Sequence, residues 1–332
     1  MGLRRGTPTL ALKRHALAGL PLRPVVRSVS IMRRMKTRQA TKQTTILLTL
    51  LAVITACSPS NQPHPIPTLI PLTPAPKQTF SPAPPADTPT PAPLACLTQP
   101  GRVDAGRLES TNPPQEYFIY LPPCYDEKTD QRYPILYLLH GQTYTYDQWI
   151  RLGAVNVIDN LILSGESIPF IVVFPDDRYW NLQAGSGFGQ RLVDDLIPYI
   201  DQNFRTLRDR DHRAIGGMSR GAGWALRLGL ARWDLFGTIG LHSLAVLQKD
   251  SSKIPEWLRD IPSASRPRVF MDIGDNDQEL IMAQLVEAQF NEYGLPHEWH
   301  LYNGAHTEEY WGAHVEEYIR WYAEGWNNAP SR

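Results

Sequence analysis

Short apolar runs alternate with longer amphipathic segments from about residue 96 onward. Two runs, Ile135–Leu139 (ILYLL) and Ile168–Phe174 (IPFIVVF), are bounded by turn-forming residues, which predicts strands buried on both faces. Further strands are expected at Glu116–Leu121, Arg213–Gly216, Phe236–Leu241, Arg268–Ile273 and His297–Tyr302, and helices at Gly189–Phe204, Ala222–Arg232, Gln278–Tyr293 and Glu309–Trp326. This alternation predicts an α/β domain with a mostly parallel central sheet and helices on both faces.

The first 57 residues have the pattern of a targeting segment. An apolar run, Thr45–Ala56, is too short to cross a bilayer comfortably, follows a basic stretch and ends at Cys57. The tetrapeptide ITAC resembles a bacterial lipobox, so we expect export and lipidation of Cys57 at the outer face of a bacterial membrane. Met35 opens a signal of ordinary length and is an alternative start to Met1. An ordinary signal peptide or membrane anchor, with Cys57 incidental, is the other interpretation.

A stretch rich in Pro, Thr, Ala and Ser follows the targeting segment. It cannot bury enough apolar surface to offset the entropy lost on ordering, so we expect a disordered, semi-stiff spacer. The chain is therefore expected to divide into a signal segment at 1–57, a linker at 58–95 and one globular domain at 96–332.

Charge is unevenly distributed along the chain. Lys plus Arg and Asp plus Glu each number 33, but 11 basic residues and no acidic ones lie in 1–57, which leaves about −11 for the remainder. An acidic mature surface argues against nucleic acid or another polyanionic partner. Three cysteines are too few for a Cys-rich zinc site, and no metal or organic cofactor is expected. Cys96 and Cys124 could pair in an exported protein, but two free thiols fit the sequence equally well.

A candidate nucleophile lies in the pentapeptide from Gly217 to Gly221 (GMSRG). In the pattern G-x-S-x-G, the two glycines permit a sharp, strained turn between a strand and a helix, which exposes the serine hydroxyl. A predicted strand precedes this segment and a predicted helix follows it. Ser219 would then lie beside the helix N-terminus, whose unpaired N–H groups point at the reacting centre.

A serine hydroxyl needs a base to act as a nucleophile. His306 follows the last predicted strand and is the favoured base. Asp277, in the loop after the preceding strand, is expected to orient His306, with Asp275 as the alternative. Among the other histidines, His242 also follows a strand and is expected to line the pocket. The order Ser219, Asp277, His306 is that of the α/β-hydrolases.

Two N–H groups should stabilise the negative charge that develops on the substrate oxygen. The backbone N–H of Arg220, the residue after the nucleophile, is the first candidate. The second is the backbone N–H of Gln142, in the turn that follows the strand Ile135–Leu139. His140, in the same turn, is expected to be a structural hydrogen-bonding residue.

The segment RYPILYLLHG, from Arg132 to Gly141, resembles the signature of the esterase D group of α/β-hydrolases. That group includes feruloyl and acetyl esterases, S-formylglutathione hydrolases, enterochelin esterases and mycolyltransferases. The resemblance extends over most of the globular part. It includes the segment GGMSRGA around Ser219, the Gly-Ala-His turn at His306, Trp149 and Trp311.

This resemblance implies an α/β-hydrolase fold, a triad of Ser219, Asp277 and His306, and an oxyanion hole formed by the two backbone N–H groups named above. Trp149 and Trp311 become candidate pocket residues beside His242. Many relatives have a small, apolar or glutamine side chain at the position of Arg220, so this arginine is expected to alter the pocket.

The sequence thus predicts an extracytoplasmic serine carboxylesterase that acts on acylated carbohydrate, such as feruloylated or acetylated xylan. Loops at 142–152 and 179–189 are expected to determine specificity. Three alternatives remain: an acyltransferase of the mycolyltransferase type, a siderophore esterase and a non-catalytic surface binding protein.

Overall fold

The computed structural model describes residues 95–178 and 187–327. The signal segment, Cys57 and the linker up to residue 94 lie outside the described residues, as do residues 179–186 of one predicted specificity loop. The domain boundaries at 57 and 95 therefore stay predictions. Within the two described ranges, no helix is long and apolar enough to cross a membrane.

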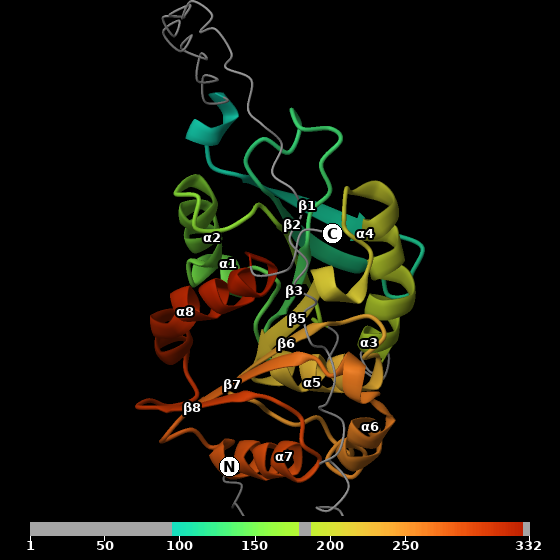
Figure 1. Ribbon diagram of the computed structural model, residues 1–332, viewed down its shortest axis with the longest axis vertical. Coiled ribbons are helices and arrows are strands. Elements are labelled where there is room, and N and C mark those ends of the chain that lie inside the picture. The colour runs from blue at the N-terminus through green and yellow to red at the C-terminus, as the bar shows by residue number, and fades with distance from the viewer. Residues whose placement is uncertain (1–94, 179–186, 328–332) are drawn as a thin grey trace, which may run out of the picture. The chain divides into compact units, whose positions relative to one another are not determined.

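An eight-stranded sheet forms the centre of the described domain, with the strand order β1-β2-β4-β3-β5-β6-β7-β8 (Figure 1). The pairs β1–β2 and β2–β4 are antiparallel, whereas all other neighbouring strands are parallel. The mostly parallel sheet is thus confirmed. The strands are β1 (Arg102–Leu108), β2 (Gln115–Leu121), β3 (Ile135–Leu139), β4 (Ile171–Pro175), β5 (Arg213–Met218), β6 (Thr238–His242), β7 (Arg268–Gly274) and β8 (Glu298–Tyr302).

Helices cover both faces of the sheet, as predicted (Figure 1). Successive residues of a strand point to opposite faces, so Tyr137 joins one apolar cluster and its neighbours Leu136 and Leu138 join the other. One face carries α1 (Gln148–Arg151), α2 (Ala154–Leu163) and α8 (Glu308–Asn327). The other carries α3 (Phe188–Gln190), α4 (Ile197–Asn203), α5 (Arg220–Ala231), α6 (Ile254–Asp260) and α7 (Leu280–Glu292).

Some elements differ from the predictions for identifiable reasons. The sequence does not predict the edge strand β1, because RVDAGRL has three charged residues among its seven and no continuous apolar run. The single helix expected at 189–204 is instead α3, a π-helical segment at Arg191–Leu196, and α4. Pro198, near the start of α4, has no N–H to donate to the carbonyl of Asp194, which interrupts the α-helical ladder there.

The sequence left the pairing of Cys96 and Cys124 open, and in the structure they form a disulfide. Their Cα atoms lie 5.0 Å apart, within the normal range for a bridged pair. The bond attaches the start of the described domain to the loop that follows β2.

Candidate active site

Ser219 lies on the sharp turn between β5 and α5. Its backbone has φ 55° and ψ −121°, a strained combination for a residue with a side chain. A methyl group on Gly217 would lie 2.4 Å from the carbonyl carbon of Gly221, and one on Gly221 would lie 2.3 Å from the carbonyl oxygen of Leu139. The two glycines of the motif are therefore required by close backbone contacts.

Ser219, His306 and Asp277 form a continuous hydrogen-bonded chain, although 87 and 29 residues separate its successive members. The Ser219 hydroxyl lies 2.7 Å from His306 Nε2. The other ring nitrogen, Nδ1, lies 2.8 and 2.9 Å from the two carboxylate oxygens of Asp277. His306 follows β8 and Asp277 follows β7, so neighbouring parallel strands end at the same edge of the sheet and bring the three side chains together.

Several donors surround the Asp277 carboxylate. Burial acts to raise the pKa of Asp277, but hydrogen bonds from His306, from the backbone N–H of Glu279 at 2.8 Å and from Ser243 outweigh it, so the pKa is lowered. This carboxylate is therefore held in its charged form. Asp275, the alternative acid, instead accepts hydrogen bonds from the Gly304 N–H and the Asn276 and Asn303 side chains, and so orders the loop after β8.

Trp149, His242 and Trp311, the three predicted pocket residues, are only 1%, 0% and 2% exposed, so they offer almost no surface to a substrate. The indole N–H of Trp149 donates to the carbonyl of Leu139 at 3.0 Å. Trp311 lies behind His306, edge-on at 5.1 Å between ring centres, and donates its N–H to the Ser243 hydroxyl at 2.9 Å. Their polar atoms are used inside the protein, so the prediction is corrected.

His242 belongs to a buried polar network that the sequence did not reveal. Its Nδ1 lies 2.7 Å from Asp272 Oδ1, and its Nε2 lies 3.0 Å from the Tyr322 hydroxyl. The second oxygen of Asp272 accepts hydrogen bonds from the hydroxyls of Tyr310 and Tyr318, at 2.8 and 2.6 Å. Burial, followed by the Asp272 charge, raises the pKa values of both tyrosines. The sequence shows several tyrosines in the last helix, α8, but it does not indicate that Asp272 accepts their hydrogen bonds.

The loop after β3, which carries Gly141, approaches Ser219 closely. A methyl group on Gly141 would lie 3.6 Å from Ser219 Cβ. The next residue, Gln142, is exposed, and its N–H makes no hydrogen bond within the described residues. Arg220 is the first residue of α5, where N–H groups lack an intrahelical partner. Within the described ranges, both predicted oxyanion donors therefore lack a protein partner and are available to a substrate oxygen.

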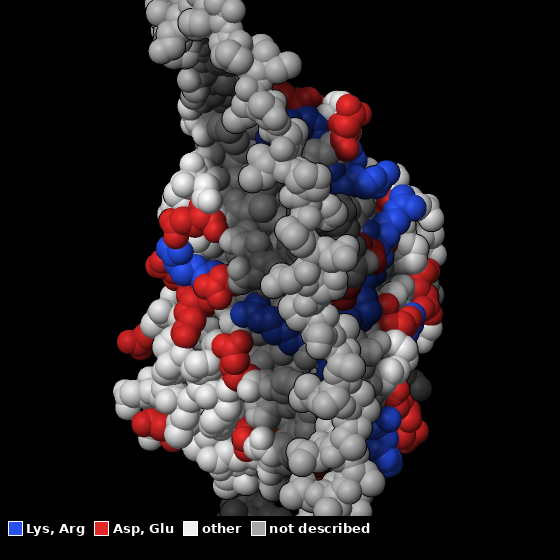
Figure 2. All heavy atoms as spheres, viewed as in Figure 1, with Lys and Arg blue, Asp and Glu red and all other residues white. Residues whose placement is uncertain are grey.

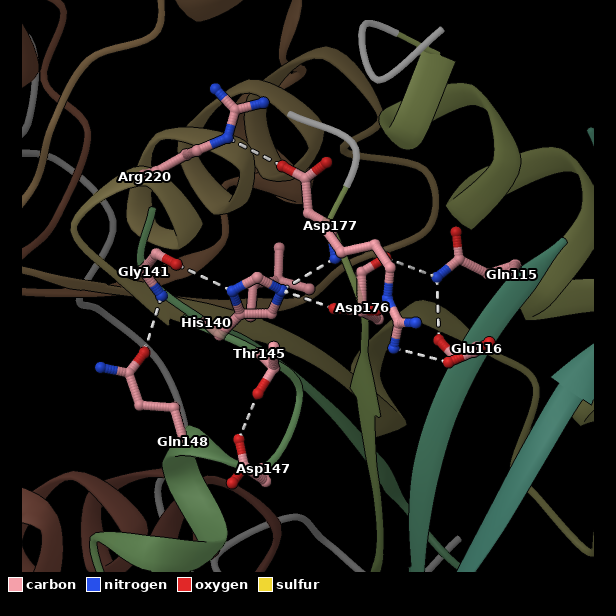
Figure 3. Close-up of polar contacts among 12 residues, drawn as sticks. Gln115, Glu116, His140, Gly141, Thr145, Asp147, Gln148, Asp176, Asp177 and Arg220 are labelled. Atoms are coloured by element: carbon pink, nitrogen blue, oxygen red, sulfur yellow. Dashed lines mark hydrogen bonds and ion pairs between the residues drawn. The ribbon is translucent and has the colours of Figure 1, made fainter. Parts of the chain in front are cut away.

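The side chain of Arg220 is directed at Asp177 (Figure 3). Arg220 Nε donates to Asp177 Oδ2 at 2.8 Å, and the indole N–H of Trp224 donates to the same oxygen at 2.9 Å. Burial raises the pKa of Asp177, and the nearby Arg220 and Trp224 offset this only in part. The charge of Arg220 is therefore paired with a buried carboxylate.

No group of three or more His, Cys, Asp or Glu side chains suited to a metal occurs in the described ranges. On the described part of the face in Figure 2, acidic and basic side chains are interspersed and do not form a continuous basic patch.

Residues 109–322 match the protein family described as "Putative esterase". The protein named endo-1,4-beta-xylanase/feruloyl esterase from Xylanibacter ruminicola is 35% identical over 191 residues, which are 54% of this chain and 25% of that protein. An esterase from Mycobacterium tuberculosis is 30% identical over 148 residues, which are 42% of this chain and 31% of that protein. The chain therefore matches about a quarter to a third of the length of these relatives.

Two solved structures share the fold. A ferulic acid esterase has a TM-score of 0.61 and 25% identity, covering 68% of this chain and 100% of that one. An S-formylglutathione hydrolase from Staphylococcus aureus has a TM-score of 0.56 and 16% identity, covering 67% and 97%. These likenesses confirm the predicted α/β-hydrolase fold.

Proposed function

Because the chain belongs to this esterase family, we propose that it is a serine carboxylesterase, with Ser219 as nucleophile, His306 as general base and acid, and Asp277 as the acid that orients His306. Membership confirms the resemblance drawn from the segments around Gly141 and Ser219. The observation that carries the mechanism is the hydrogen-bonded chain from Ser219 Oγ through His306 to Asp277, at a strained turn between a strand and a helix.

The reaction proceeds in two halves. Ser219 Oγ attacks the ester carbonyl carbon while His306 Nε2 takes the hydroxyl proton, and the carbonyl oxygen becomes an oxyanion. Collapse of this intermediate breaks the bond to the alcohol, which leaves with the proton from His306, and Ser219 retains the acyl group. Water then attacks the acyl-enzyme, His306 accepts its proton and returns one to Ser219, and the carboxylic acid is released.

Two features of the chain lower the barrier to these steps. The lowered pKa of Asp277 keeps a negative charge beside His306 Nδ1, which stabilises the imidazolium that forms in each half-reaction. The N–H groups of Gln142 and Arg220 are proposed to bind the oxyanion, where loss of one donor typically costs about 10²–10³ in kcat.

We propose acylated carbohydrate, in particular feruloyl or acetyl esters of xylan, as the substrate class. The named relatives support it, since one is a xylanase/feruloyl esterase and one solved structure is a ferulic acid esterase. We also propose that the protein is exported and lipid-anchored through Cys57. Expression of a Cys57→Ala variant tests the anchor: the unchanged chain should fractionate with membranes and the variant should not.

The proposed activity is tested with purified wild-type protein and Ser219→Ala on p-nitrophenyl acetate, methyl ferulate, acetylated xylan and a ferric-siderophore ester. We expect Ser219-dependent hydrolysis that favours ferulate or xylan acetate. Transfer of the acyl group to an added sugar, without free acid, would instead support the acyltransferase alternative. Full activity of Ser219→Ala would contradict the mechanism.

A further inference from the structure

We infer that His140 is a positioning residue that fixes the Gly141–Gln142 peptide so that the N–H of Gln142 faces Ser219. This inference rests on the proposed esterase function and concerns how its oxyanion hole is held in place. It is carried by the contacts of one peptide group, all within the described residues (Figure 3).

The carbonyl of Gly141 is held by two donors on the side away from the Gln142 N–H. His140 Nδ1 donates to this oxygen at 2.8 Å, and the Tyr144 N–H donates to it at 3.3 Å. A trans peptide is planar, so its C=O and the following N–H point in opposite directions. Holding the Gly141 oxygen therefore sets the direction of the Gln142 N–H.

The preceding peptide is held as well. The Gly141 N–H donates to Gln148 Oε1 at 2.8 Å, and the buried Gln148 side chain donates from Nε2 to Glu308 Oε1 at 3.2 Å. Glu308 lies two residues after His306 and also pairs with Arg151 at 3.0 Å. Gln148 thus connects the loop that carries the oxyanion donor to the segment that carries the proposed base.

The tautomer of His140 is fixed from its other nitrogen. The backbone N–H of Asp177 points at His140 Nε2 at 2.8 Å, which requires a lone pair on Nε2 and places the ring hydrogen on Nδ1. Asp176 Oδ1 lies 3.3 Å from the same nitrogen. Only this tautomer can donate to the Gly141 carbonyl, so Asp177 holds the ring in the useful form.

Asp177 also connects the two proposed oxyanion donors. Its backbone N–H holds His140 and thereby the Gly141–Gln142 peptide, while its carboxylate holds the side chain of Arg220 at 2.8 Å. Arg220 supplies the other backbone N–H. Arg220 therefore has a structural partner, Asp177, that connects the turn at Ser219 to the Gly141–Gln142 peptide.

The turn itself is strained where it carries the donor. Thr143, the residue after Gln142, has φ 71°, a conformation that β-branched residues rarely adopt. Such strain persists only where the surroundings over-determine the backbone, and the two hydrogen bonds to the Gly141 carbonyl do so here.

Two substitutions of His140 separate its two hydrogen bonds. Asn places an amide N–H near the position of Nδ1 and so keeps the donor to Gly141, whereas Gln places its amide oxygen near Nε2 and keeps only the acceptor for Asp177. We expect His140→Asn to stay within about 3-fold of wild-type kcat and His140→Gln to lose about 10- to 100-fold, with little change in KM. Affinity for a trifluoromethyl ketone, which forms an oxyanion on Ser219, should fall by the same factor as kcat/KM.

His297→Gln is the matched control. His297 Nδ1 also donates to a backbone carbonyl, that of Leu295 at 2.8 Å, but in the connection between α7 and β8. The His297→Gln variant should lose stability but keep the wild-type kcat. If His140→Gln fails to fold, Gln148→Met, which removes the acceptor for the Gly141 N–H, should show the same pattern. Equal kcat for His140→Gln and His140→Asn, or a loss confined to KM, would overturn the inference. Absence of Ser219-dependent activity in the wild type would instead overturn the proposed function.

Discussion

Two aspartate–histidine pairs lie near the carboxyl ends of adjacent strands, and their surroundings differ. In one, Asp277 binds His306, whose other nitrogen accepts a hydrogen bond from the Ser219 hydroxyl. In the other, Asp272 binds His242 at 2.7 Å, but the other nitrogen of His242 lies 3.0 Å from the hydroxyl of Tyr322. The side chain of His306 is 16% exposed and that of His242 is 0% exposed.

An aspartate–histidine pair does not by itself indicate catalysis. A buried polar network whose hydrogen bonds are all satisfied stabilises the fold, because any lost partner leaves an unpaired group in a low-dielectric interior. The same pair becomes reactive only where solvent and a nucleophile can reach its free nitrogen. We therefore expect the two pairs to respond to mutation in opposite ways, one through rate and the other through stability.

The largest expected effect is a loss of catalytic rate when the exposed pair, Asp277 and His306, is disrupted. Asp277→Asn should lower kcat about 10⁴-fold, because the amide favours the wrong tautomer of His306 and cannot stabilise its cation. Its melting temperature should fall only modestly, by the stability that the ionised carboxylate contributes at neutral pH. Asp275→Asn is the matched control and should retain activity, since Asp275 contacts the Gly304 loop. Steady-state kinetics on p-nitrophenyl acetate measures both, and equal losses in the two variants would contradict the assignment.

The next effect is on the stability of the buried pair. Asp272→Ala should lower the free energy of unfolding by about 3–5 kcal/mol, because it leaves His242, Tyr310 and Tyr318 without their acceptor in the core. Urea unfolding measures the loss. A stable Asp272→Ala protein that lost activity as completely as Asp277→Asn would mean that the buried pair takes part in the chemistry.

Ser243 lies between the two pairs and gives a smaller effect. Its N–H donates to the Asp272 carbonyl at 2.9 Å, its hydroxyl accepts from Trp311, and it hydrogen-bonds to Asp277. Ser243→Ala should lower kcat about tenfold, the equivalent of one hydrogen bond to a charged group. Ser252→Ala, at an exposed position, serves as the control. Unchanged kcat in Ser243→Ala would show that Asp277 is held adequately without it.

The smallest effect is a difference in pH dependence between two buried carboxylates. The pKa of Asp277 is lowered, so its contribution to stability is present above its unfolded pKa and is lost as pH falls through its folded pKa. Burial raises the pKa of Asp177, so its ionisation costs stability at neutral pH and the cost disappears at lower pH.

Urea unfolding between pH 3 and 7 can separate these two contributions. As pH falls, the stability of the wild type relative to Asp277→Asn should decrease, and that relative to Asp177→Asn should increase. Each slope is bounded by about 1.4 kcal/mol per pH unit for a single proton. Slopes of the same sign would contradict one of the two pKa directions.

Much of the fold and the chain order of the site could be predicted from the sequence. Buried strands such as β3 have continuous apolar runs, and the loops that follow parallel strands meet at one edge, so Ser219, Asp277 and His306 could be chosen by position. The half-exposed strand β1 has no such run and was missed.

The contacts that support the site could not be predicted in the same way. His140 and Asp177 are 37 residues apart and Arg220 and Asp177 are 43 apart, and nothing local indicates that they pair. The pocket prediction was wrong because Trp149 and Trp311 were chosen by their place in the resemblance, whereas their exposure depends on how α1 and α8 pack.

The central claim, that Ser219 is an activated nucleophile, is tested most directly by reaction with a fluorophosphonate followed by intact-mass and peptide mass spectrometry. The account predicts one adduct per wild-type chain, located on Ser219, none on Ser219→Ala, and strongly slowed labelling of Asp277→Asn. A folded wild-type protein that stays unlabelled, or a Ser219→Ala protein labelled to the same extent, would contradict it.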